Sequence, residues 1–204
     1  MSAVAGAPAG PYATYPSLRG QVVLVSGGAT GLGAEFVAQF AAQGARVAFV
    51  DVQDDAGHAL VDDVAAAGSP RPLYRHADVR ELATYQQVIA EVAQVLGPVG
   101  VLVNNAANDA RHTADQVDAA FWDERMRGNL AHYYFATRAV VAMMRAAGRG
   151  SVVNLGSIST HIKLPDLVVY RTAKAGVEGL TRALAQESSV GTASGSTASS
   201  PAGS

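Results

Sequence analysis

Two patterns of apolar and polar residues follow one another in turn along this chain. Short apolar runs rich in Val and Leu lie between turns, and they predict strands buried on both faces of a sheet. Between these runs, apolar residues recur three and four positions apart, which predicts helices. This order predicts an α/β fold, a doubly wound parallel sheet with helices on both faces. The predicted strands are 21–26, 45–51, 73–79, 99–107 and 151–157, and the predicted helices are 34–43, 54–67, 81–96, 118–147 and one after Pro165.

The turn after the first predicted strand is rich in glycine and opens the first predicted helix. Gly27, Gly31 and Gly33 let the backbone turn tightly and approach a pyrophosphate, whose charge meets the helix N-terminus. Asp51 ends the second predicted strand, where it would accept hydrogen bonds from both adenosine ribose hydroxyls and repel a 2′-phosphate. The pattern therefore indicates a dinucleotide site that favours NAD over NADP. The plainer interpretation is a set of ordinary turn glycines and a strand-end aspartate.

Tyr170 and Lys174 lie four residues apart in the last predicted helix, and Ser157 ends the fifth predicted strand. Residues i and i+4 share a helix face, so the ammonium would lie near the phenol. A nearby cation favours the phenolate and lowers the pKa of tyrosine from about 10, which makes the phenol a usable general base. The serine hydroxyl could hold the oxygen that is deprotonated. Taken alone, such a pair is more often two surface residues of a helix.

The composition fits one domain and excludes several classes of protein. The chain has 204 residues, of which 49% are hydrophobic and 16% charged, and its net charge of −2 shows no basic excess for nucleic acid or an anionic membrane. Without cysteine it forms no disulfide and uses no thiolate nucleophile. It contains no apolar run long enough for a membrane span, no signal-peptide pattern and no metal-ligand grouping of histidines. We therefore expect a soluble cytoplasmic protein without a metal or membrane partner.

The ordered motifs GGATGLG, Asp78-Val79, NNAA, Asn129, Ser157 and Tyr170-x-x-x-Lys174 resemble those of the short-chain dehydrogenase/reductase family. The resemblance covers about residues 18–187 and implies a Rossmann-like NAD-binding oxidoreductase domain that lacks the last strands of the family fold. We expect a flexible arm over 1–17 and a disordered Ser/Gly/Ala tail over 188–204.

The resemblance also implies a role for each matching residue. Tyr170 would exchange the proton, Lys174 would hold the nicotinamide ribose and lower the pKa of Tyr170, and Ser157 would position the substrate oxygen. Asn129 would anchor a water that relays protons to Lys174, and Asp78 would contact the adenine amino group. The implied catalytic residues are Asn129, Ser157, Tyr170 and Lys174, and the implied cofactor-binding residues are Gly27, Thr30, Gly31, Leu32, Gly33, Asp51, Asp78, Val79, Asn105, Ala106, Ala107, Tyr170 and Lys174.

Several segments, among them NNAANDARH and FWDERMRGNL, are similar to the aldose dehydrogenases of this family. The similarity implies oxidation of the C1 hydroxyl of a D-xylose-like aldopyranose to a lactone, with Asn108, Ser157, His161 and Tyr170 as substrate-binding residues. A polyol needs many paired donors and acceptors, which such side chains supply. The segment NDARH could instead be a solvated loop. Two other functions stay open: a dehydrogenase of another secondary alcohol such as a steroid, and an inactive truncated nucleotide-binding product.

Helix pairing between copies is a further implication, because family members commonly form dimers or tetramers. We expect a dimer through the helix that ends near Ala147 and the helix that carries Tyr170. The small residues Ala175, Gly176, Gly179 and Ala183 give the second helix a face that permits close packing. The alternative is that this face packs against the sheet within one chain.

The family resemblance stops at Glu187, where a low-complexity stretch begins. With GC-rich synonymous codons, a shifted reading frame from Val190 would encode the family's sixth strand and its Pro-Gly turn. We therefore interpret the chain as truncated by a frameshift after about residue 189. Loss of the last strands would expose a sheet edge and an apolar face. We expect a chain that keeps the adenosine half-site but folds weakly and shows little activity.

Overall fold

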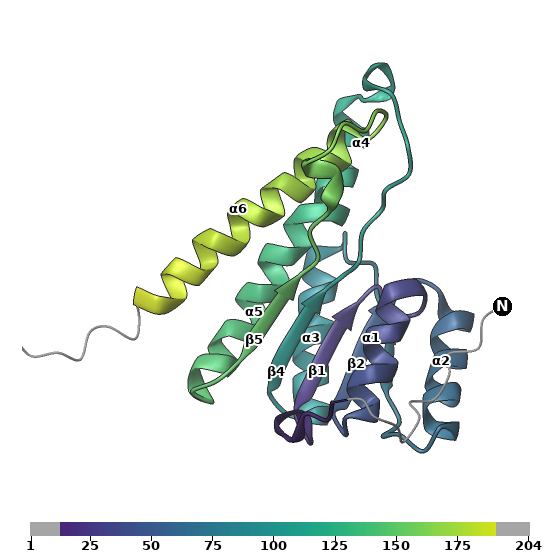
Figure 1. Cartoon of the computed structure of the whole chain (residues 1–204), viewed down its shortest axis with the longest axis vertical. Helices are drawn as coiled ribbons and strands as arrows, with labels where there is room; N and C mark the ends of the chain where they lie inside the picture. Colours follow the sequence, from purple (N-terminus) through teal and green to yellow (C-terminus); the bar gives the residue numbers. More distant parts are fainter. Residues whose placement is uncertain (1–12, 191–204) are drawn as a thin grey trace, which may run out of the picture.

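The computed structural model describes residues 13–190, which form a parallel sheet with helices on both faces (Figure 1). The sheet has five strands in the order β3-β2-β1-β4-β5. The predicted fold class is therefore confirmed, whereas the expectations for residues 1–12 and 191–204 lie outside the described residues. The strands are β1 (Val22–Ser26), β2 (Arg46–Asp51), β3 (Leu73–His76), β4 (Val99–Asn104) and β5 (Ser151–Asn154).

The helices alternate with these strands along the chain. The α-helices are α1 (Gly31–Ala42), α2 (Asp54–Ala66), α3 (Leu82–Leu96), α4 (Ala119–Met126), α5 (His132–Ala146) and α6 (Val168–Val190), and the short helices are η1 (Pro16–Leu18), η2 (Ala114–Gln116), η3 (Arg127–Ala131, a π-helix) and η4 (Ile158–Thr160). Helix α6 thus extends three residues past the predicted domain end at 187. In the predicted arm, the backbone amide of Tyr15 donates to Gln43 Oε1 at 2.8 Å.

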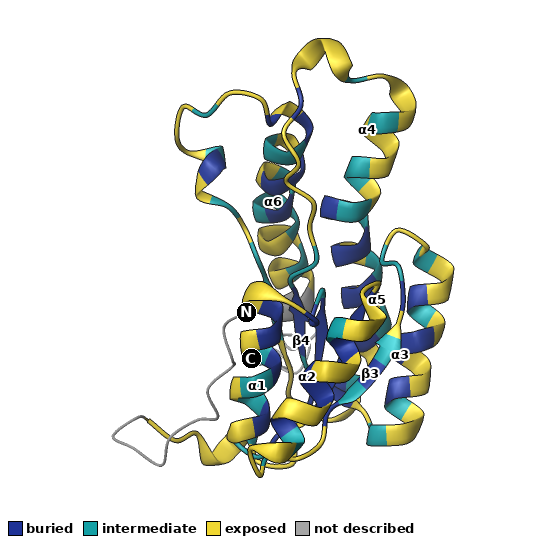
Figure 2. Ribbon diagram, turned by 90° about the vertical axis from the view of Figure 1, so that its right-hand side faces the viewer, coloured by how far each residue is buried: buried dark blue, intermediate teal, exposed yellow. Residues whose placement is uncertain are grey.

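Alternate side chains of the central strands enter two separate hydrophobic layers. Leu24 of β1 packs with Tyr85 of α3 and Val140 of α5 on one face. On the other face, Val25 packs with Val37 of α1 and Val64 of α2. Figure 2 shows the resulting pattern, with buried residues along the strands and on the inner sides of the helices. Successive side chains of a strand point to opposite faces, and both faces of this sheet are buried. The central strands therefore form continuous apolar runs in the sequence.

Two features of the predicted elements are wrong in detail. The predicted helix 118–147 is divided, because η3 inserts a π-helical turn between α4 and α5. The third, fourth and fifth strands end three residues early, at His76, Asn104 and Asn154. Their last predicted residues leave the hydrogen-bonded ladder and form loops at the carboxyl edge of the sheet. That early ending releases polar side chains for a site, as expected for a parallel α/β sheet.

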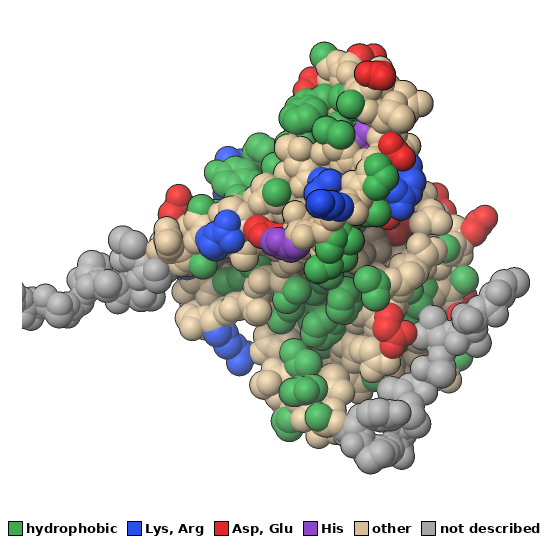
Figure 3. Space-filling model, turned by 45° about the horizontal axis from the view of Figure 1, so that its top comes forward, with side chains coloured by type: hydrophobic (Ala, Val, Ile, Leu, Met, Phe, Trp, Pro, Cys, Tyr) green, Lys and Arg blue, Asp and Glu red, His purple; other side chains and the backbone are tan. Residues whose placement is uncertain are grey.

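Strand β5 is the outermost strand of the described sheet on its side. Its Val153 is 42% exposed, and Figure 3 shows hydrophobic side chains gathered on the front face of the molecule. On the opposite face a groove of about 890 Å³ separates β5 and the end of α5 from α6. Helix α6 is joined to β5 at Asn154, whose side chain donates to Thr181 Oγ1 at 2.9 Å. Over the described residues, no helix combines the length and hydropathy needed to cross a membrane.

Candidate active site

A cavity of about 730 Å³ opens at the carboxyl edge of the sheet. It begins beside the glycine-rich turn and β2, passes the end of β3, and reaches α4 and η3. Most residues that the sequence assigned to the cofactor lie in its wall. The predicted residues that line it are Gly27, Thr30, Gly31, Leu32, Gly33, Asp51, Asp78, Val79, Asn105, Ala106, Ala107, Asn108 and Asn129.

The glycine-rich turn has a backbone that side chains would block. Gly27 has φ +64°, and a Cβ there would lie 2.8 Å from the Cα of Ala106. A Cβ on Gly33 would lie 1.8 Å from the carbonyl oxygen of Gly27. Helix α1 begins at this turn with no acidic residue in its first turn and no side chain capping its amides. These free N–H groups and the close backbone approach fit a pyrophosphate.

Asp51 lies at the end of β2 with its carboxylate fixed by backbone amides. Its Oδ2 accepts from Ala29 N at 3.0 Å, and its Oδ1 accepts from Val52 N at 2.8 Å and Gln53 N at 3.1 Å. The residue is 9% exposed and lines the cavity. The site therefore carries a fixed negative charge at the glycine-turn end, where the sequence predicts the adenosine ribose.

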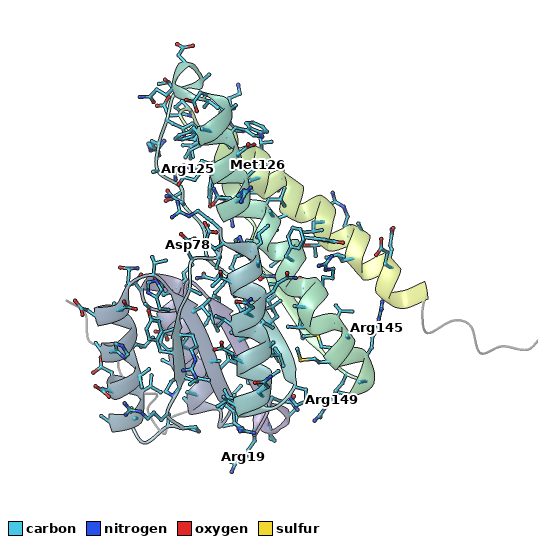
Figure 4. The ribbon with its side chains drawn as sticks, turned by 180° about the vertical axis from the view of Figure 1, so that it is seen from behind. Arg19, Asp78, Arg125, Met126, Arg145 and Arg149 are labelled. Carbon is cyan, nitrogen blue, oxygen red and sulfur yellow. The ribbon has the colours of Figure 1, made fainter. Side chains whose placement is uncertain are left out.

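Asp78 follows β3 and is bound by a residue that the sequence analysis missed. The guanidinium of Arg80 donates to both carboxylate oxygens of Asp78 and also pairs with Glu124 of α4. The hydrogen bonds from Arg80 hold the pKa of Asp78 below its usual value. Figure 4 shows Asp78 between the sheet and the end of α4, where Arg125 and Met126 lie. The arrangement ties the loop after β3 to α4 across the cavity wall.

Arg125 is a second cavity residue that sequence reasoning missed. Its Cζ lies 4.8 Å from the centre of the Phe121 ring, one helical turn earlier. Its Nε and Nη1 atoms are buried and have no hydrogen-bond partner among the described residues. The spacing of four between Phe121 and Arg125 in a predicted helix is a signal that the sequence could have given. Whether the Arg125 side chain lines the cavity depends instead on how α4 packs.

Asn105 joins the cavity floor to the glycine turn. Its side-chain amide donates to the carbonyl oxygens of Ser26 at 3.0 Å and Gly27 at 2.9 Å. The Ser26 hydroxyl accepts in return from the backbone amides of Asn105 and Ala106. These bonds fix the ends of β1 and β4 relative to each other. The glycine turn is therefore preorganised by side chains from a strand distant in sequence.

Asn129 lies fully buried in the π-helical segment η3. Its side-chain oxygen accepts from Asn108 N at 2.7 Å, and its amide donates to Asn108 O at 3.1 Å. This paired contact anchors the loop after β4 against η3. The Asn108 side chain in turn accepts from Ala110 N at 3.0 Å, which shapes the predicted substrate loop.

Lys174 is 1% exposed, and its ammonium points into the protein beside Tyr170. The Nζ atom lies 5.7 Å from the centre of the Tyr170 ring. Its hydrogen bonds go instead to Tyr133 Oη at 2.8 Å and Leu155 O at 2.7 Å. Burial lowers the pKa of Lys174 to about 8, and the nearby charge of Asp109 opposes that change. Tyr133 was not among the residues predicted from sequence.

Ser157 and His161 lie in the segment between β5 and α6. The Ser157 hydroxyl is 2.8 Å from the Ser159 hydroxyl and accepts from Ser159 N, which begins η4. The imidazole of His161 lies 2.9 Å from Glu178 on α6. Hydrogen bonds from Thr160 and then His161 hold the pKa of Glu178 below its usual value. His161 therefore faces a carboxylate of this chain in the present arrangement.

Residues 21–191 match the family model described as short chain dehydrogenase. The chain belongs to the short chain dehydrogenase family. Family membership makes it an oxidoreductase that uses a nicotinamide cofactor.

Two sugar dehydrogenases are among the relatives of this short chain dehydrogenase. It is 49% identical over 175 residues to D-xylose 1-dehydrogenase of Caulobacter vibrioides, which covers 86% of this chain and 68% of the relative. It is 43% identical, with the same coverage, to the probable galactose dehydrogenase GalD of Rhizobium meliloti. A 3-alpha-(or 20-beta)-hydroxysteroid dehydrogenase of Mycobacterium tuberculosis is 36% identical and covers 83% of this chain and 64% of the relative.

Solved structures of short-chain enzymes share the fold. A putative short-chain alcohol dehydrogenase from Sinorhizobium meliloti 1021 superposes with a TM-score of 0.79 at 31% identity, covering 84% of this chain and 68% of the other. A metagenomic short-chain oxidoreductase in complex with NADP has a TM-score of 0.79 at 29% identity, covering 84% of this chain and 77% of the other. The neighbours therefore include an enzyme that binds the phosphorylated cofactor.

Proposed function

We propose that the protein is an NAD-dependent dehydrogenase that oxidises the C1 hydroxyl of a D-xylose-like aldopyranose to a lactone. The observation that carries this proposal is the similarity to two sugar dehydrogenases, at 49% and 43% identity. The polar loop from Asn108 onward supports it, because it lies at the cavity and is held by Asn129. A sugar needs such paired polar groups more than an apolar alcohol does.

The preference for NAD rests on Asp51. Its carboxylate accepts backbone hydrogen bonds that hold it at one position. There it can accept hydrogen bonds from the ribose hydroxyls, whereas a 2′-phosphate would bring a second negative charge against it. The side chain of Gln53 also reaches Asp51 and Thr30 and completes this end of the cavity.

The roles proposed for the other residues rest on the resemblance of their motifs to those of the family. The bound nicotinamide would supply the hydride acceptor. Tyr170 would take the hydroxyl proton while the Lys174 ammonium stabilises its phenolate. Ser157 and Asn108 would hold sugar oxygens, and Asn129 would keep the Asn108 loop in place. His161 would have to exchange its bond to Glu178 for one to the sugar.

The test measures cofactor binding and turnover separately. NADH and NADPH binding is followed by calorimetry, and NADH formation is measured with D-xylose, D-galactose, L-arabinose and D-glucose. We expect NADH to bind more tightly, a pentose or hexose to be oxidised, and Tyr170→Phe to remove nearly all turnover without removing NADH binding. Equal rates for the intact and Tyr170→Phe proteins would refute the assignment of Tyr170. Binding without turnover on any substrate would favour the nucleotide-binding alternative.

A hydroxysteroid is the second candidate substrate, because a hydroxysteroid dehydrogenase is 36% identical to this chain. The same assay with 3α- and 20β-hydroxysteroids distinguishes the two. Steroid oxidation without sugar oxidation would reverse the proposed order.

We also propose that copies of the chain pair through α5 and α6. Ala175 and Ala183 of α6 are exposed, and the space beside Gly179 is open. Gly176 instead packs within the chain, since a Cβ there would lie 2.9 Å from Leu130. Light scattering at micromolar concentration should give the mass of a dimer or tetramer, and a monomer mass would refute this pairing.

A further inference from the structure

The hydrogen bonds of Lys174 point to a residue without an assigned role. A lysine ammonium has three N–H donors, and burying it without partners is costly. Two described acceptors are within reach of Lys174 Nζ: the hydroxyl of Tyr133 at 2.8 Å and the carbonyl oxygen of Leu155 at 2.7 Å. One donor is left for the side on which Tyr170 lies.

Tyr133 is itself fully buried and its hydroxyl has a fixed direction. The hydroxyl donates to Leu155 O at 3.2 Å, the same carbonyl that accepts from Lys174. Because the only hydroxyl hydrogen is directed at that carbonyl, the lone pairs of Tyr133 Oη face the ammonium. The three groups form a closed triangle between α5, the end of β5 and α6. The phenol is thus an acceptor for Lys174 and not a link to solvent.

We propose that Tyr133 is a positioning residue that holds the Lys174 side chain in its charged form against α6, with one N–H donor free toward Tyr170. The inference rests on the proposed function, in which the ammonium supports the phenolate of Tyr170. In this arrangement Tyr133, near the start of α5, supports the catalytic pair, while Asn129 of the preceding segment η3 anchors the loop after β4. Tyr133 lies four residues after Asn129, just beyond the π-helical segment η3.

The charged and titratable groups around Lys174 agree with this role. Burial lowers the pKa of Lys174 to about 8, and the nearby carboxylate of Asp109 opposes that change. His132 precedes Tyr133, and burial lowers its pKa to about 4, so it is neutral at pH 7 and adds no second positive charge. Burial raises the pKa of Tyr133, which keeps it a neutral acceptor. Tyr170 is the remaining titratable neighbour, at 5.7 Å from ring centre to Nζ.

The test uses the fact that the chain has only two lysines, Lys163 and Lys174. Protein labelled with ¹³C-lysine is titrated by NMR at the Cε positions, and the exposed Lys163 serves as the internal reference. Tyr133→Phe removes the hydroxyl and keeps the ring. The matched control is Tyr134→Phe, because Tyr134 is the next residue of α5 and is 39% exposed.

We expect the Lys174 pKa to fall by about one unit or more in Tyr133→Phe, since a hydrogen bond to the charged form favours that form. One unit is a tenfold change in the protonation equilibrium. Tyr134→Phe should leave it unchanged, and Lys163 should titrate alike in all three proteins. An unchanged Lys174 pKa in folded Tyr133→Phe would overturn the proposal.

A second measurement covers a Tyr133→Phe protein that does not fold. In the unmodified protein at pH 6, nuclear Overhauser contacts should join the Lys174 Cε protons to the Tyr133 ring, and their absence would overturn the proposal. The titration needs neither cofactor nor sugar, so a protein that turns over no substrate refutes the proposed function alone. In an active protein, the pH profile of kcat should shift in Tyr133→Phe in the same direction as the Lys174 pKa.

Discussion

One carboxylate, that of Asp51, has both a structural and a proposed recognition role. It accepts three backbone hydrogen bonds, from Ala29, Val52 and Gln53, and so fixes the turn between β2 and α2 as well as the glycine turn. Each of these amides would be left partly unsatisfied without it, which costs about 1–3 kcal/mol for a buried group. A change at this residue therefore alters stability and cofactor choice together, and the two effects must be measured apart.

We predict that Asp51→Ser raises the ratio of kcat/KM for NADP⁺ to that for NAD⁺ at least about tenfold, because removing the fixed charge removes the repulsion of a 2′-phosphate. The melting temperature should fall at the same time. The measurement is initial rates with both cofactors, and thermal unfolding followed by circular dichroism. Asp55→Ser is the control, since Asp55 is exposed in the first turn of α2 and does not line the cavity. An unchanged cofactor ratio in Asp51→Ser would contradict the prediction.

Residues that the sequence predicted lie at positions that a local pattern determines, whereas the missed residues owe their positions to contacts between distant elements. Asp51 and Asn105 were found because each follows a strand, and the ends of parallel strands meet at one edge. Arg80 pairs with Glu124, 44 residues later, and Lys174 with Tyr133, 41 residues earlier. Those contacts depend on how α4 and α5 pack, which no local pattern records. The roles assigned to the predicted residues stay predictions.

At the scale of elements, the π-helical segment η3 is the feature that the sequence analysis did not predict. Periodicity alone predicts one continuous helix through residues 118–147. An additional residue in the turn of η3 instead directs Asn129 inward, where its paired bonds to Asn108 compensate the poorer helix geometry. The presence of Gly128 within this segment was the available signal, because glycine weakens a helix locally.

We predict opposite effects of alanine at two glycines of this region. A Cβ on Gly128 would lie 3.5 Å from Arg80 Cγ, an ordinary contact, so Gly128→Ala should stabilise the protein by about 0.5–1 kcal/mol. A Cβ on Gly176 of α6 would lie 2.9 Å from Leu130, so Gly176→Ala should be destabilising by overpacking. Thermal unfolding should show a rise of about 2–4 °C per kcal/mol in the first case and a fall in the second. A change of the same sign in both variants would refute this account of their surroundings.

For the whole molecule, the parallel sheet and the two layers of helices follow from the sequence because each buried strand needs a helix on either face. The position of α6 does not follow. It contacts η3 and η4 at its start, and Thr181 further along bonds to Asn154 of β5, with the groove lying between α6 and β5. Figure 4 shows Arg145 and Arg149 at that end of α5. The expectation that the chain folds weakly stays a prediction, which unfolding measurements on the whole chain will decide.

The last prediction concerns the pH dependence of global stability and rests on His132. This first residue of α5 is 0% exposed, its ring lies near that of Tyr85 of α3, and its Nδ1 lies 3.2 Å from Arg127 O. Burial lowers its pKa from 6.5 to about 4 in the folded protein. Between these values the unfolded chain binds more protons than the folded one, so stability rises with pH. The contribution is complete above pH 6.5 and is lost as pH falls toward 4, a change of about 3 kcal/mol in total.

Urea unfolding at pH 7.5 and pH 5 measures this contribution. The carboxylates with a lowered pKa are those of Asp54, Asp78 and Glu178, whose ordinary pKa values are 3.8, 3.8 and 4.5. Their contribution to stability is lost only as the pH falls below these ordinary values, so it changes little between pH 7.5 and pH 5. We expect the free energy of unfolding to be about 2 kcal/mol lower at pH 5 for the unmodified protein. His132→Leu should lose most of this dependence, because no imidazole is left to be protonated on unfolding, whereas the exposed His58→Gln should keep it. The same pH dependence in His132→Leu as in the unmodified protein would show that other groups cause it.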